Sequence, residues 1–218
     1  MTFKKIALIG ILSIGFLGGC LGAKPEEELY VTLESAANQE KKLFDYVRVF
    51  NQSETKSQEL YNQIIQEGKE HNETVIPKIE QAIATVTERE KLLEKEKDIL
   101  EISTKEITSI HSYINKIDDQ KLQRQAKKVE EVYVNRCASL QKLNESYKKT
   151  LQTEKELYEQ LKEKETNLKE ISEKVKTVNV LNEEITKEKE QFNQYTKEYN
   201  EKKLKFYKDA KIKIKEKM

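Results

Sequence analysis

The chain has 218 residues, 40 of them basic and 39 acidic, so that its net charge is +1 although 36% of it is charged. This balance gives no electrostatic reason to expect a nucleic-acid-binding protein, and a 36% hydrophobic share excludes a simple disordered chain. Beyond Gly22 the sole glycine is Gly68, and the prolines are Pro25 and Pro77. Because strands and tight turns depend on these two residue types, we expect an all-α protein.

Residues 1–19 have the features of a lipoprotein signal peptide. A short basic start and an apolar run lead to Leu17-Gly18-Gly19-Cys20, in which an aliphatic residue and two small residues precede a cysteine. Small residues give a signal peptidase access to the backbone, and the apolar run is shorter than a membrane span. The alternative is an uncleaved helix that carries a cysteine by chance.

A lipid anchor at Cys20 follows from this pattern. Its thiol would take an S-diacylglyceryl group, and cleavage before it would free an amino terminus for a further N-acyl chain such as palmitate. Residues 20–28 would then form a short tether. These features predict a protein held on the outer, extracytoplasmic face of the cell membrane, most simply in a Gram-positive bacterium.

The rest of the chain, residues 29–218, is predicted to form a single helical-bundle domain. Apolar residues recur every three or four positions, and Ile79, Val86, Leu93, Leu100, Ile107 and Ile114 lie seven apart. Short turns between long helices make neighbours antiparallel. We therefore expect an elongated up-and-down bundle of three to four helices with spectrin-like, coiled-coil packing. The expected helices are 29–67, 75–116, 120–176 and 180–214.

Residues 175–182 decide the helix count. Four β-branched side chains and two asparagines favour a break, which is the preferred interpretation. Against it, an apolar heptad from Ile171 through Val178 to Phe206 continues without interruption. In that case a single long helix would replace the last two.

The C-terminal residues form the one local concentration of positive charge. Its lysines are Lys202, Lys203, Lys205, Lys208, Lys211, Lys213, Lys215 and Lys217. They suit the negative end of a helix dipole, and they also suit contact with anionic lipid headgroups or anionic wall polymers. With four helices the basic end would lie near the lipid anchor; with three it would point away. Aromatic residues concentrate beside it, and their helical spacing favours a core position over stacking on glycans.

Catalytic and ligand-binding motifs are missing from the sequence. It contains none of the zinc, nucleophile-elbow, phosphate-loop or paired-cysteine signatures, so we predict no enzyme, no cofactor and no metal site. His71 and His111 are expected to be ordinary solvated histidines. Cys137 has no disulfide partner once Cys20 is lipidated; it is expected to be a small apolar residue on a helix, with a reactive or intermolecular thiol as the alternative.

The lipobox, the long helices and the segment from Phe192 to Lys203, followed by Phe206-Tyr207, resemble the YkyA-like family of cell-wall-binding lipoproteins of Firmicutes. The resemblance covers essentially the whole chain. It implies an extracytoplasmic helical bundle on a lipid anchor, with no established catalytic site. The expected function is binding or scaffolding at the cell envelope, with peptidoglycan, an anionic wall polymer or an envelope protein as partner. The alternative is a coiled-coil accessory regulator of an envelope complex, such as a wall hydrolase or export machinery.

Overall fold

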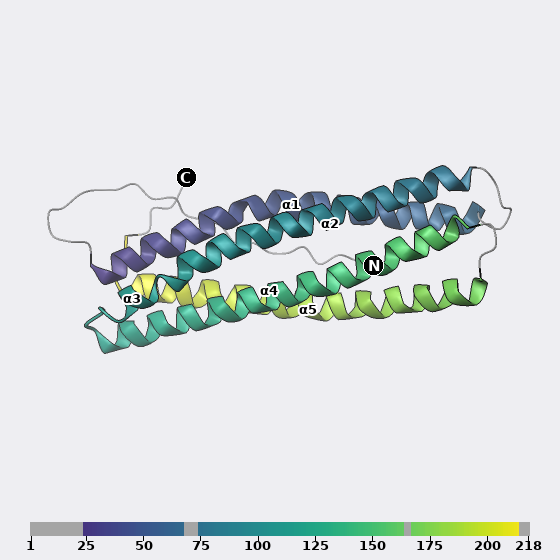
Figure 1. Ribbon diagram of the computed structural model, residues 1–218. Helices are drawn as coiled ribbons and strands as arrows, with labels where there is room; N and C mark the ends of the chain where they lie inside the picture. The colour runs from purple at the N-terminus through teal and green to yellow at the C-terminus, as the bar shows by residue number, and fades with distance from the viewer. Residues whose placement is uncertain (1–23, 68–73, 164–166, 214–218) are drawn as a thin grey trace. The chain divides into compact units, whose positions relative to one another are not determined.

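A computed structural model describes residues 24–67, 74–163 and 167–213 of the chain (Figure 1). The described residues form helices and connecting turns, with no strand among them, which confirms the all-α prediction. The helices are α1 (Pro25–Glu67), α2 (Val75–Thr108), α3 (His111–Ile114), α4 (Gln120–Leu161) and α5 (Leu168–Asp209). Residues 68–73, between the first two expected helices, lie outside the described residues. The second helix begins at Val75 as expected, and Pro77, as its third residue, needs no hydrogen-bond partner there.

The four long helices contribute to two compact units. Unit 1 comprises the described parts of residues 1–42, 99–140 and 189–218, and unit 2 comprises those of residues 43–98 and 141–188. Each unit includes part of α1, α2, α4 and α5, and the single domain expected over 29–218 stays a prediction. Each is described below by itself.

Unit 1 has a core of aliphatic and aromatic side chains from every helix that enters it. Its buried members are Leu29, Tyr30, Leu33, Ala36, Ile107, Ile110, Ile114, Ile117, Ala126, Val129, Val132, Tyr133, Tyr199, Phe206 and Tyr207. Burying aromatic side chains of this size is among the largest single contributions to stability in a thin bundle. Of the aromatic residues predicted as core in α5, Phe192, Tyr199, Phe206 and Tyr207 are buried, and Tyr195 packs half-buried against the cluster.

Unit 2 draws its buried apolar residues almost entirely from α1, α2 and α4. The larger ones are Leu43, Phe50, Leu60, Ile64, Val75, Ile79, Val86, Leu92, Leu93, Leu143, Tyr147, Leu151, Leu157 and Tyr158. The six residues of the predicted heptad run are all buried. Three lie in unit 2, two lie in the part of α2 that belongs to unit 1, and one lies in α3. The seven-residue spacing thus identified the packed face correctly.

The second long helix is shorter than predicted. The second helix was expected to reach residue 116, but α2 ends at Thr108 and the four-residue α3 follows. The next long helix begins at residue 120, as expected. Asp119 caps it as α4, because its carboxylate accepts the backbone N–H groups of Lys121 and Leu122 at 2.7 and 3.0 Å.

The predicted break at residues 175–182 is wrong, because α5 is helical throughout that segment. The third helix ends at Leu161 rather than 176, and the fourth begins at Leu168 rather than 180. Asn167 caps α5, since its side-chain oxygen accepts the Lys169 N–H at 3.0 Å while its amide donates to Glu170 at 3.0 Å. Four helices still result, as the preferred interpretation required.

Candidate functional site

The predicted lipidation site, Cys20, and its lipobox lie outside the described residues. Described structure starts at Lys24, whose carbonyl accepts the N–H groups of Glu27 and Glu28 at 2.9 and 3.1 Å and so opens α1. Three acidic residues in the first turn of α1 suit the positive end of its dipole. A helix therefore begins five residues after the predicted anchor.

The start of α1 and the end of α5 lie together in unit 1. The rings of Tyr30 and Tyr207 meet edge to face, with centroids 4.7 Å apart. One turn along α1, the carboxylate of Glu34 accepts hydrogen bonds from the Tyr207 hydroxyl and the Lys203 ammonium, both at 2.9 Å. The basic C-terminal segment is thus at the end of unit 1 where α1 begins, as expected for four helices.

Lys203 has to be removed from the predicted surface lysines. It is buried, and its ammonium pairs with Glu34, which is 1% exposed, so that it cannot reach a polymer or a membrane. The helical period explains this position, because residues 199, 203 and 206 share the inward face of α5. Rings of Tyr199 and Tyr207 lie 5.5 and 5.8 Å from the Lys203 ammonium and further stabilise its charge.

Some of the other lysines of this segment form a recorded ion pair, and others do not. Lys202 pairs with Glu198 at 3.3 Å, and Lys205 pairs with Asp209 at 3.1 Å. Exposed lysines with no ion pair recorded in the described structure are Lys208, Lys211 and Lys213. Lys215 and Lys217 lie outside the described residues.

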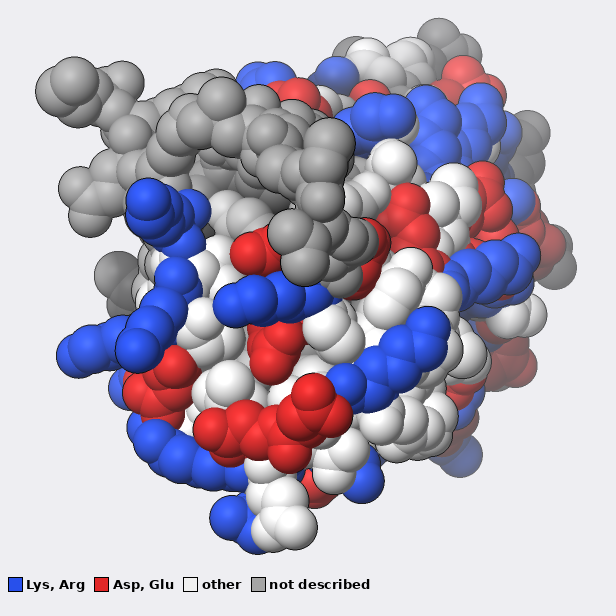
Figure 2. Space-filling view, turned by 90° about the vertical axis from the view of Figure 1, so that its left-hand side faces the viewer, with Lys and Arg blue, Asp and Glu red and all other residues white. Residues whose placement is uncertain are grey.

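Positive charge at this end is mixed with negative charge. Figure 2 views the molecule from the side where α3 lies in Figure 1, and it shows Lys and Arg side chains beside Asp and Glu side chains over that face. Asp209 illustrates the mixing: hydrogen bonds from Gln125, Lys121 and Lys205 hold the pKa of its carboxyl well below the usual range. Binding of an anion here would therefore depend on the few exposed, unpaired lysines.

A buried ion pair between Glu40 and Arg136 joins α1 to α4 inside unit 1. The Arg136 guanidinium donates to both carboxylate oxygens at 2.9 Å and to the Thr196 hydroxyl at 3.1 Å, while Tyr133 donates to the same carboxylate at 2.8 Å. Phe192 covers the guanidinium, with 5.1 Å from its ring centroid to Cζ. This bidentate, ring-covered geometry is the strong form of a carboxylate–arginine pair.

The surroundings of this pair shift the pKa of both donors. Burial alone would lower the pKa of Arg136, but the Glu40 carboxylate outweighs burial and keeps the guanidinium charged. Burial, followed by the charge of Glu40, raises the pKa of the Tyr133 hydroxyl well above its ordinary value. Each donor is therefore held in its protonated form and acts as a fixed hydrogen-bond donor.

A second buried arginine occupies the interior of unit 2. Arg89 of α2 pairs with Glu154 of α4 and donates to the Ser57 hydroxyl of α1 at 3.0 Å. Tyr158 lies 3.5 Å from that hydroxyl, and burial raises its pKa to about 12. Burial also raises the pKa of Glu154, although the neighbouring Arg89 opposes this shift.

These clusters are closed rather than open to substrate. Their polar groups are directed at one another between helices, so that they tie helix to helix and leave no exposed acid, base or nucleophile. Glu40 and Ser57 are polar residues among the buried positions of α1. A signal in the sequence could have identified them. Both are polar residues at positions where the helical period predicts burial, and each could be matched with an arginine, Arg136 or Arg89, at a similar position on another helix.

Cys137 is half-buried on α4, in agreement with the expected core position. Burial raises the pKa of its thiol, which lowers the fraction of reactive thiolate. His111 is exposed and lies 3.4 Å from the Glu130 carboxylate, while His71 lies outside the described residues.

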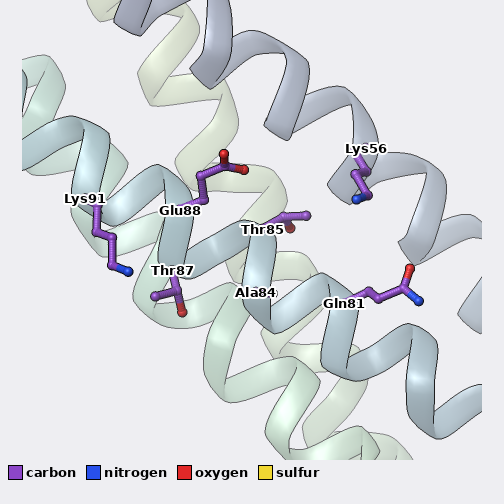
Figure 3. A pocket seen from close by; sticks show the side chains of 7 residues that line it. All are labelled: Lys56, Gln81, Ala84, Thr85, Thr87, Glu88 and Lys91. Carbon is purple, nitrogen blue, oxygen red and sulfur yellow. The ribbon is translucent and has the colours of Figure 1, made fainter.

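An open groove lies between α1 and α2 of unit 2 (Figure 3). Lys56 comes from α1, and the remaining lining residues come from α2, with Thr85 and Glu88 pointing toward α1 (Figure 3). Glu88 already accepts a hydrogen bond from Ser53 at 2.9 Å. Thr85 and Thr87 donate to backbone carbonyls of their own helix. The lining side chains with no hydrogen bond recorded among the described residues are therefore Lys56, Gln81 and Lys91.

No group of three or more His, Cys, Asp or Glu side chains in the described part of the chain converges to hold a metal ion. None of the described helices combines the length and apolar character that crossing a membrane requires.

The fold and sequence together define an all-helical bundle protein of the lipoprotein class. The family described as "Putative cell-wall binding lipoprotein", YkyA, matches residues 24–209, and the chain belongs to this family. Its fold is similar to the 1.6 Å crystal structure of a conserved protein of unknown function from Staphylococcus aureus, with a TM-score of 0.73 and 15% identity over 84% of this chain and 93% of that one. At this identity the likeness shows the fold alone. No curated protein matches the sequence.

Proposed function

We propose that this protein is a non-catalytic binding protein of a Gram-positive cell envelope, anchored to the membrane through lipid on Cys20 and in contact with the cell wall. The description of its family supports this assignment, as does the lipobox before Cys20. The contact would be made by helix surfaces, because the charged groups of the interior are engaged with one another.

The observation that carries the proposal is the contact between Tyr30 and Tyr207. It places the exposed lysines at the end of α5 and just beyond it beside the start of α1. Pro25 lies five positions after Cys20, and an extended chain over five positions spans roughly 17 Å. Lys208, Lys211 and Lys213 would then be held near the outer surface of the membrane. The ligand chemistry they suit is phosphate, supplied either by anionic wall polymers or by lipid headgroups.

Co-sedimentation with purified sacculi tests this proposal. The protein would be the mature chain with Cys20→Ala, and the sacculi would be prepared with and without their anionic polymers, across a salt series. We expect saturable binding that weakens when the polymers are removed and when salt rises, because exposed charges are screened beyond about 10 Å at 0.1 M salt. A parallel arm with anionic vesicles distinguishes lipid headgroups from polymer.

Matched charge variants sharpen this test. Lys208→Gln, Lys211→Gln and Lys213→Gln together should reduce binding severalfold. The control carries the same change at Lys42, Lys91 and Lys149, which are exposed lysines of three other helices, and should bind like the parent. Equal loss in both variants would show nonspecific attraction. Absence of binding to every preparation would overturn wall binding and direct the search to protein partners by crosslinking in cells.

A further inference from the structure

The two halves of α5 differ sharply in how they are packed. Residues 189–209, which belong to unit 1, contain six buried side chains: Phe192, Thr196, Tyr199, Lys203, Phe206 and Tyr207. Residues 168–188, which belong to unit 2, contain one, Ile185. Leu168 and Val180 in this half are 81% and 56% exposed. We call residues 168–188 the arm.

The other three helices of unit 2 do not share this weakness. Between Leu43 and Glu67, α1 buries six side chains, and α2 and α4 bury comparable sets that include the Arg89 cluster. Because free energy of burial scales with the apolar area removed from water, α1, α2 and α4 supply nearly all of the packing energy of unit 2. The arm lies against a core that the other helices largely complete.

The local sequence of the arm also opposes a stable helix. Val175, Val178 and Val180 lose side-chain freedom in a helix, and Asn179 and Asn182 favour caps and turns. These residues are the ones from which the sequence predicted a break. Helical structure in the arm therefore depends on its neighbours, and those neighbours bury little of it.

Exposed ion pairs are the recorded polar contacts that hold the arm to α4. Lys174 pairs with Glu156 at 2.7 Å, and Glu188 pairs with Lys142 at 3.4 Å. Each pair has one well-exposed partner, Lys142 at 73% and Glu156 at 48%, so that salt screens both pairs. Surface pairs of this kind contribute little stability.

We propose that the arm is a releasable segment, which detaches from unit 2 and unfolds locally while residues 189–209 stay packed in unit 1. Ile171, Val175, Val178 and Leu181, now half-buried along one face, become available when the arm leaves. The proposed change is conformational: the arm unfolds at a lower free energy than the core of either unit.

Hydrogen exchange of the mature chain with Cys20→Ala, followed by mass spectrometry of peptides, tests the proposal. We expect residues 170–185 to exchange at least about tenfold faster than 43–60, 141–158 and 192–207, because a segment with few buried contacts opens well below the global free energy. Exchange of the arm should also accelerate with salt. If the arm exchanges in step with 43–60 and 141–158, unit 2 opens as one body and the proposal is wrong.

Two single variants supply a matched comparison. Lys174→Glu replaces the arm's pair with a repulsion and should speed exchange of residues 170–185 about two- to fivefold. Lys148→Glu disrupts a similar exposed pair, to Glu94 at 3.0 Å, that joins α4 to α2 within the same unit. It should leave the arm's exchange unchanged. Equal acceleration of the arm by both variants would contradict an independent arm.

Discussion

Single residues in the interior of unit 1 combine charge with burial. Arg136 and Glu40 are 3% and 10% exposed at their side chains, yet every hydrogen bond recorded for them is made within the bundle. A buried pair of this kind adds little net stability compared with apolar residues, because both charges were taken out of water. Removing one residue of the pair alone strongly lowers the stability of the fold, because the other charge is then left buried without a partner.

Arg136→Met should therefore destabilise the protein by about 3–5 kcal/mol, since it strands the Glu40 carboxylate in the core. Adding Glu40→Gln should recover much of that loss, because the new amide is neutral and still accepts the Tyr133 hydroxyl. Urea titrations followed by circular dichroism measure both variants. As a control, Lys148→Met removes an exposed pair and should cost no more than about 1 kcal/mol. A double variant as unstable as Arg136→Met would contradict this account.

Among the elements, the end of α5 shows how a helix can stop without glycine. The N–H of Ile212 bonds to the Tyr207 carbonyl at 3.0 Å, and that of Lys211 bonds to the Lys208 carbonyl at 3.1 Å. This is the Schellman arrangement, which requires a left-handed residue after the helix. Lys211 takes that conformation with φ of 57°, and it is the one non-glycine residue with positive φ in the described chain.

Lys211→Gly should raise the free energy of unfolding by about 0.5–1 kcal/mol, because glycine adopts positive φ without the clash of a Cβ atom. Lys213→Gly removes the same charge from an exposed residue beyond the helix and should give no such gain. Thermal and urea unfolding of the two variants measure the difference. Equal effects would assign the change to charge rather than to backbone conformation.

Helix boundaries show which local signals can be trusted. The start of α4 at residue 120 agrees with its sequence, because an acidic pair, Asp118-Asp119, precedes a periodic apolar run and offers a cap. Asn167 was missed, although it is followed three residues later by Glu170, a pattern that approximates a capping box. The β-branched residues near 178 were given more weight than the uninterrupted apolar heptad. Tertiary contacts, weak as they are in the arm, overrode that propensity.

Across the whole molecule, buried tyrosines recur in both units. Burial is the largest cause of the raised pKa in Tyr133, Tyr199 and Tyr207 of unit 1 and in Tyr147 and Tyr158 of unit 2. A raised pKa in the folded state means that folding favours the protonated hydroxyl. The resulting stability is present in full below the unfolded pKa of about 10 and is lost as the pH rises toward the folded value.

We therefore expect the melting temperature to fall steeply above pH 10, together with cooperative appearance of tyrosinate absorbance. Tyr158→Phe should lessen this loss by about 2–3 kcal/mol between pH 10 and 12, because the pKa of Tyr158 is raised from 10.0 to about 12. Melting curves of parent and variant from pH 7 to 12 provide the measurement. An identical alkaline decline in the two proteins would show that Tyr158 ionises without unfolding.

The sequence by itself determined the helical class, the family, the apolar faces and the predicted anchor, because each of these is written in local patterns: spacing, capping residues, scarcity of glycine and proline, and the lipobox. Tertiary structure alone decided which polar residues at core positions meet. Glu40 pairs with Arg136, which lies 96 residues further along the sequence, and Glu34 pairs with Lys203, which lies 169 residues further along. Such pairs depend on which helices pack together and in what register, and a pattern of neighbouring residues in the sequence does not specify either.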